Sequence, residues 1–241
     1  MVLTLYKLNA SPPARAVLMT IDALKIPDVE CVDVNLLEGE HMSEEFVQMN
    51  PQHTIPVLKD DDFVIWDSHA IGGYLVTVYG EDDSLYPIDP RKRAIVDQRL
   101  HFDSGILFPY FFVISFSYHV PTIKIIISFD RKYNLFYIFT RIFPFLQSKL
   151  IFFGEKSFRE ESLNAIHAAY EHAENFLTSS WMAGDDVTLA DICCVSSISS
   201  MNKILPIDGD TFPKISAWLQ QCSEQDFFKN LLCKQIKLVE Y

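Results

Sequence analysis

In the first eighty residues the spacing of apolar residues alternates between that of strands and that of helices. The order of these patterns limits the possible folds more than any other feature of the chain. Residues 2–8 have a strand pattern, and the strict alternation at 29–34 predicts a half-buried strand, whereas 14–25 carry apolar residues at helical spacing. Residues 43–47 predict a short helix capped by Ser43. Residues 55–59 and 63–66 flank three aspartates and predict a hairpin, and 68–79 predict a helix capped by Ser68. The order βαβαββα indicates an α/β layer with a mixed sheet.

A second pattern begins after a polar stretch. Residues 81–90 hold two prolines among acidic residues, which is typical of a linker. Beyond it, helical patterns recur at 91–108, 157–177, 188–201 and 212–222, with few strand signals. The sequence therefore predicts α/β plus all-α architecture: a domain at 1–80, a linker at 81–90 and an all-helical domain at 91–241.

Charge and cysteine usage exclude several classes of function. The 241 residues carry a formal charge of −12, which disfavours nucleic-acid binding. The five cysteines form no CxxC pair and no metal-ligand spacing, so we expect reduced thiols and no metal site. The longest charge-free apolar run, 106–118, is shorter than the ~20 residues of a membrane span. Without a basic, apolar leader at the N-terminus, we expect a cytoplasmic protein.

The first candidate site is Ser11-Pro-Pro-Ala-Arg15, between the first predicted strand and helix. Prolines suit a first helical turn, where their missing N–H groups are not needed. Ser11 then lies at a helix N-terminus, where backbone donors and the helix dipole favour an anion. The alternative is an ordinary N-cap serine, which spacing alone favours.

The second candidate is Asn50-Pro-Gln-His-Thr-Ile-Pro56, just before a strand. A cis bond at Ile55-Pro56 would turn the Ile55 backbone outward, toward an extended peptide. The alternative is a simple strand entry, since only about 5–6% of X–Pro bonds are cis.

The third candidate is Asp67-Ser68, at the start of a helix. First-turn N–H groups and Ser68 can bind a carboxylate, and Asp67 can bind an ammonium group. Together they suit the zwitterionic end of an amino acid. The alternative is a cap with an acid that complements the dipole.

A fourth motif, Thr188-Leu-Ala-Asp191, predicts a capping box and therefore a structural role. The adjacent Cys193 and Cys194 are expected to be core thiols.

Taken together, these motifs resemble the insect epsilon-class (delta/epsilon group) cytosolic glutathione transferases. The resemblance covers 1–108 and 151 to about 225. Beyond the four motifs, it includes Asn35-Leu-Leu-Glu-Gly-Glu-His41, Asp83-Ser-Leu-Tyr-Pro87, Leu100-His-Phe-Asp-Ser-Gly-Ile-Leu-Phe108 and Ile151-Phe-Phe-Gly154.

The resemblance implies a thioredoxin-like domain, an all-helical glutathione transferase C-terminal domain and a homodimer. It implies conjugation of glutathione, as co-substrate and without a cofactor, to small hydrophobic electrophiles in detoxification. Ser11 matches the hydroxyl that activates the sulfur. The residues expected to hold glutathione are His41 and His53 at its glycyl end, Thr54, Ile55 and Pro56 beside its backbone, and Asp67, Ser68 and His69 at its γ-glutamyl end. The expected hydrophobic pocket comprises Pro13, Leu36 and Phe108.

The segment at about 110–142 departs from the family. It inserts roughly thirty residues where a short connection is expected, and Phe112 stands where the family often has an arginine. Residues 109–153 hold ten of the nineteen phenylalanines and a charge of +4. We interpret the segment as a translated intron or gene-model error; a genuine insertion over the pocket is the alternative.

Two functions are compatible with these residues. The first is an active glutathione transferase, favoured by Ser11, His53, Asp67 and Ser68. The second is a non-catalytic carrier of hydrophobic ligands on the same fold, favoured by the interrupted helix after Phe108. A thiol-disulfide oxidoreductase is disfavoured because position 11 lacks a cysteine.

Overall fold

A four-stranded mixed sheet forms the centre of the first half of the chain. The computed structural model describes residues 3–36, 38–112 and 160–236. The strand order is β2-β1-β3-β4, with β1 parallel to β2 and antiparallel to β3, and β3 antiparallel to β4. The strands are β1 (Leu3–Lys7), β2 (Glu30–Asp33), β3 (Val57–Asp60) and β4 (Phe63–Trp66).

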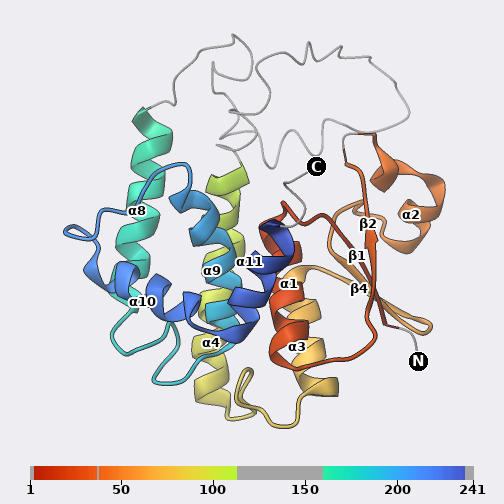
Figure 1. Ribbon diagram of the computed structural model, residues 1–241, viewed down its shortest axis with the longest axis horizontal. Coiled ribbons are helices and arrows are strands. Elements are labelled where there is room, and N and C mark those ends of the chain that lie inside the picture. Colours follow the sequence, from red (N-terminus) through yellow and green to blue (C-terminus); the bar gives the residue numbers. More distant parts are fainter. Residues whose placement is uncertain (1–2, 37, 113–159, 237–241) are drawn as a thin grey trace.

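Helices cover both faces of this sheet (Figure 1). Leu5 and Leu58 pack against α1 (Pro12–Ala23) and α3 (Ser68–Tyr79). Because successive strand residues point to opposite faces, Tyr6 and Val57 face the other way. They pack with Phe46 of α2 (Glu44–Met49), which follows η1 (Glu40–Met42).

Helix α1 has two apolar faces because it lies between the sheet and the helices of the second half. Val17 and Ile21 belong to the core under the sheet. Ala16 and Met19 belong to the large helical core. The close approach continues at α3, where a Cβ on Gly72 would lie 2.8 Å from a methyl carbon of Leu189.

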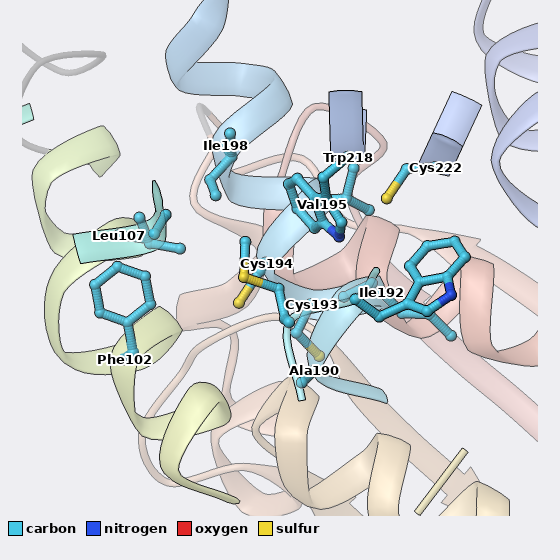
Figure 2. Close-up of a cluster of buried hydrophobic side chains, with 14 of the residues drawn as sticks. Phe102, Leu107, Ala190, Ile192, Cys193, Cys194, Val195, Ile198, Trp218 and Cys222 are labelled. Atoms are coloured by element: carbon cyan, nitrogen blue, oxygen red, sulfur yellow. The ribbon is translucent and has the colours of Figure 1, made fainter. Parts of the chain in front are cut away.

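Helices joined by loops make up the described residues of the second half. Helix α9 runs through its centre and is buried at every position from 189 to 198. Figure 2 shows Cys193 and Cys194 on this helix, among apolar side chains that include Phe102 and Trp218. The helices are α4 (Pro90–Phe102), the π-helical η2 (Asp103–Leu107), α8 (Glu160–Phe176), α9 (Leu189–Asn202), α10 (Pro213–Ser223) and α11 (Asp226–Ile236).

The predicted fold class is confirmed, with the predicted order of elements through residue 80. The capping box is also confirmed, because the Thr188 N–H donates to Asp191 Oδ2 at 2.9 Å. No helix or strand is assigned between Tyr79 and Pro90, where the linker was predicted. The atypical segment at about 110–142 lies outside the described residues from 113 onward.

Two local predictions were wrong, and two features were not predicted. The cap of α3 is Asp67, since its side chain and not that of Ser68 accepts the first-turn N–H groups. Strand β2 is an edge strand with three of four residues exposed, not a half-buried one. The helix predicted at 91–108 changes to π geometry at Asp103. Helix α11 was not predicted at all.

Candidate functional site

The three predicted site motifs meet at one edge of the sheet. Val57 pairs with β1 on one side and with Trp66 on the other. Pro56 immediately precedes Val57, Asp67 immediately follows Trp66, and the Ser11 loop follows the paired end of β1. The topology therefore brings these motifs, which are distant in sequence, to the same end of three adjacent strands.

Ser11 occupies the N-cap position of α1 without acting as a cap. Its backbone is extended, and Pro13 at the second helical position lacks one of the two N–H groups that an N-cap side chain can accept from. Its side chain makes no capping hydrogen bond, and its own N–H donates to the Leu8 carbonyl at 2.9 Å. The half-buried hydroxyl therefore stays available at the positive end of the helix dipole.

Buried Asn50 holds the loop before β3 in place. Its amide nitrogen donates to both the carbonyl and the hydroxyl of Thr54, and its oxygen accepts from the Gln52 N–H. The Ile55-Pro56 bond is cis, as the motif suggested. Asn50 was not assigned a role from sequence, although it opens the motif.

Two histidines face one another beside this loop. The rings of His41, on η1, and His53 have centroids 6.2 Å apart. Burial lowers the pKa of His41 below its ordinary value, and the nearby His53 lowers it further. His41 Nδ1 is buried and makes no hydrogen bond within the described residues. His53 has φ of 44°, a left-handed backbone that non-glycine residues rarely adopt.

Asp67 is both a helix cap and an exposed carboxylate. It has φ of 75°, which places local strain at the start of α3. Its Oδ1 accepts from the N–H groups of His69 and Ala70, at 3.0 and 3.2 Å. Within the described part of the chain, no hydrogen bond uses Oδ2. One carboxylate oxygen therefore fixes the turn while the other faces outward. Ser68, the next residue, is 8% exposed.

An ion pair between His69 and Asp103 links the two halves of the chain next to this turn. His69 Nε2 lies 2.9 Å from Asp103 Oδ2, and both side chains are largely buried. Burial opposes the charge on His69, but the hydrogen bond and the negative charge of Asp103 favour it, and the pKa of His69 is raised above its ordinary value. Asp103 was missed from sequence; an acid inside an apolar helical stretch was the available signal.

The predicted pocket residues Pro13, Leu36 and Phe108 are all half-buried, on three different segments. Leu36 packs against the cluster of Val34, Phe46 and Val57. A cavity of about 1070 Å³ lies elsewhere, between the second half of α1, β2, the 81–85 loop and α11. None of the predicted site residues lines it.

The described thiols on α9 are poor candidates for chemistry. Burial raises the pKa of both Cys193 and Cys194, and both are fully buried core residues, as predicted. Across 3–36, 38–112 and 160–236, no group of three His, Cys, Asp or Glu residues could hold a metal ion. Over the same residues, no helix is both long and apolar enough to cross a membrane.

Two family profiles match the chain: "Glutathione S-transferase, N-terminal domain" over residues 1–77 and "Glutathione S-transferase, C-terminal domain" over 116–226. The chain is 57% identical over 243 aligned positions to Glutathione S-transferase 1 of Manduca sexta, covering 98% of this chain and 97% of the relative.

Solved structures agree with this match. An epsilon-class glutathione S-transferase from the housefly Musca domestica superposes with a TM-score of 0.76 at 38% identity, covering 95% of this chain and 91% of that one. A glutathione transferase homologue from Drosophila mojavensis, solved with bound glutathione, gives a TM-score of 0.73 at 36% identity, covering 95% and 90%.

Proposed function

The chain belongs to the insect glutathione S-transferase family, and from this premise we propose how its site performs glutathione conjugation. The protein is an enzyme that joins glutathione to hydrophobic electrophiles. Ser11 is the catalytic residue: its hydroxyl donates a hydrogen bond to the glutathione sulfur. The observation that carries this assignment is a hydroxyl at a helix N-terminus that makes no capping bond.

The chemistry requires a thiolate. A thiol with a pKa near ~8.5 is mostly protonated at pH 7 and is then a weak nucleophile. The Ser11 hydroxyl and the positive end of α1 stabilise the anion, and the thiol proton leaves to solvent. The thiolate then attacks the electrophilic carbon, a C–S bond forms, and the leaving group departs with its electron pair. Holding both reactants together contributes further through proximity.

The rest of glutathione is held along the edge of the sheet. The outward oxygen of Asp67 takes the γ-glutamyl ammonium group, and Ser68 takes the adjacent carboxylate. The backbone of Ile55, turned outward before Pro56, pairs with the extended peptide. His41 and His53 bind the glycyl carboxylate. The role of His41 is supported by its Nδ1 atom, which is buried and has no hydrogen-bond partner among the described residues. Thr54 and His69 complete this set, and Pro13, Leu36 and Phe108 line the pocket for the electrophile.

We also assign this chain to the epsilon class, as a cytoplasmic homodimer with domains at 1–80 and 91–241. The epsilon-class housefly structure supports the class assignment. Gel filtration with light scattering tests the dimer.

Retention on immobilised glutathione, followed by conjugation of an aryl halide, tests the function directly. Retention with glutathione-dependent product formation is the expected result. Absence of both contradicts the proposal.

A carrier of hydrophobic ligands is the second candidate, and the cavity beside α11, which is lined by apolar and charged residues and contains none of the proposed glutathione residues, would be its separate binding space. A carrier would bind an apolar fluorescent dye that excess glutathione does not displace, and it would produce no conjugate.

Replacing Asp67 by asparagine is expected to raise the KM for glutathione while kcat at saturation stays close to the parent value. The contact with the ammonium group is made in the ground and transition states alike. Asparagine still caps α3, so the fold is maintained. Steady-state kinetics measure the effect. The matched control is Asp89→Asn, because Asp89 caps α4 with the same two-bond pattern; an equal KM in the two variants would sink the assignment.

Affinity for glutathione is expected to increase as the pH falls, because His41 becomes protonated. A bound carboxylate favours the charged imidazole, so binding raises the lowered pKa of His41 and takes up a proton. S-methylglutathione, which has no ionisable thiol, should therefore bind roughly three- to tenfold more tightly at pH 5.5 than at 7.5. Titration calorimetry measures this. The dependence should weaken in His41→Asn and persist in His101→Asn, where the replaced histidine is exposed; a flat parent profile contradicts the assignment.

A further inference from the structure

Arg15 is a buried cation that has no role in the proposed mechanism described above. It lies on α1, one helical turn after Ser11, and is 9% exposed. Its Nη2 donates to the Ser196 carbonyl at 2.7 Å and to the Ser200 hydroxyl, both on α9. Among the described residues, it makes no ion pair with an acidic side chain.

The packing around Arg15 does not require a charge. Ser200 Oγ also donates to the Ser196 carbonyl at 2.7 Å, so both acceptors keep a partner without the arginine. A buried guanidinium that lacks a carboxylate partner is costly. Burial lowers the pKa of Arg15 to about 10, so the group remains charged at neutral pH. An apolar side chain of similar size would dock α1 against α9 with less penalty.

The position of the charge suggests its use. Ser196 and Ser200 lie in the last two turns of α9, whereas Arg15 lies in the first turns of α1, at the positive end of that helix. The negative end of α9 offsets part of the guanidinium charge, and the remaining positive potential adds to that of the α1 N-terminus. Little water lies around the guanidinium to screen its field.

Other titratable groups lie on the elements that pack against α1 and α9. On α9, burial keeps Cys193 and Cys194 as neutral thiols, and Asp191 is engaged by four donors more than one turn away from Ser196. The remaining groups are Asp67, His69, Tyr74 and Tyr79 at α3, Asp226 and Lys229 on α11, and Asp22 near the far end of α1.

We propose that Arg15 is an electrostatic positioning residue: its buried charge, one turn from Ser11, stabilises the thiolate of bound glutathione without touching it. This inference rests on the proposed function, since it needs the sulfur at Ser11. In this proposal Arg15 stabilises the thiolate through its electric field, whereas Ser11 does so through a hydrogen bond.

The test compares Arg15→Met with Arg15→Lys. The pKa of bound glutathione is measured by the ultraviolet absorbance of the thiolate across a pH series, and kcat/KM is measured over the same range. Removing the charge should raise the thiol pKa by about one unit, as expected for two charges about a side-chain length and a helical turn apart. Below the pKa, kcat/KM should fall about tenfold, and it should approach the parent value at high pH. The lysine variant should stay near the parent, and affinity for S-methylglutathione should not change.

The outcomes separate this inference from the assignment of Ser11. An unshifted thiol pKa in Arg15→Met, with a shift in Ser11→Ala, overturns the role of Arg15 alone. No shift in either variant overturns the proposed site as well. If Arg15→Met fails to fold, Arg15→Gln replaces it, because glutamine keeps a donor without the charge. A raised pKa in the glutamine variant but not in the lysine variant supports the proposal, and equal values overturn it.

Discussion

Replacing Ser11 by alanine is expected to lower kcat by about tenfold to more than a hundredfold near neutral pH and to leave the melting temperature almost unchanged. The hydroxyl donates to a charged sulfur, and such a hydrogen bond contributes roughly 1.5–3 kcal/mol. It makes no capping bond in the folded protein, so its loss costs the helix little. Stopped-flow and steady-state rates, with the pKa of bound glutathione, measure the effect.

Ser43 supplies the matched control, because it is also an N-cap serine in the first half of the chain. Its side chain accepts from the Phe46 N–H, so Ser43→Ala should lower stability by about 1 kcal/mol. Its turnover should stay at the parent level. We therefore expect Ser11→Ala to lower activity but not stability, and Ser43→Ala to lower stability but not activity. Unchanged turnover in Ser11→Ala would refute the catalytic assignment.

Replacing Asp191 by alanine is expected to reduce the free energy of unfolding by about 3–5 kcal/mol. Asp191 is 1% exposed, and four donors converge on its carboxylate. They are the N–H groups of Met182 and Thr188, the Thr188 hydroxyl and Trp218 Nε1, at 2.8 to 3.0 Å. Alanine leaves all of them in a dry environment without an acceptor. Denaturant unfolding measures the loss.

The control for this variant is Asp226→Ala. Asp226 also lies in the first turn of a helix, but its side chain is 95% exposed. Its removal should shift the denaturation midpoint very little. Similar midpoints for the two variants would show that Asp191 contributes only the ordinary effect of an acid near a helix start.

Local patterns predicted most of the fold because the sheet and the amphipathic helices follow simple periods. Helix α11 was not predicted because no distinct helical pattern was found after residue 222. Its position is determined by packing against α1 and α10. The cap of α3 was misplaced by one residue because aspartate and serine are both good caps and only backbone geometry separates them. The π turn at Asp103 has no local signal, since it depends on contacts across the structure.

The candidate site divides in the same way. Ser11, Pro56 and Asp67 could be proposed from sequence because each lies at a recognisable junction between a strand and a helix or loop. Asp103 and Arg15 were missed because their meaning depends on partners in the other half of the chain. Sequence spacing cannot show that the buried Arg15 has no acidic partner among the described residues, or that His69 pairs with Asp103.

The ion pair between His69 and Asp103 is expected to stay charged in mildly alkaline solution. Because the folded pKa of His69 is raised, the stabilisation from the pair is complete below pH 6.5 and is lost only as the pH rises toward about 11. The glutathione thiol titrates well before that, near ~8.5 or lower. We therefore expect the contact between the two halves to keep its charge while the thiolate forms, so that a change of rate in mildly alkaline solution reflects the sulfur.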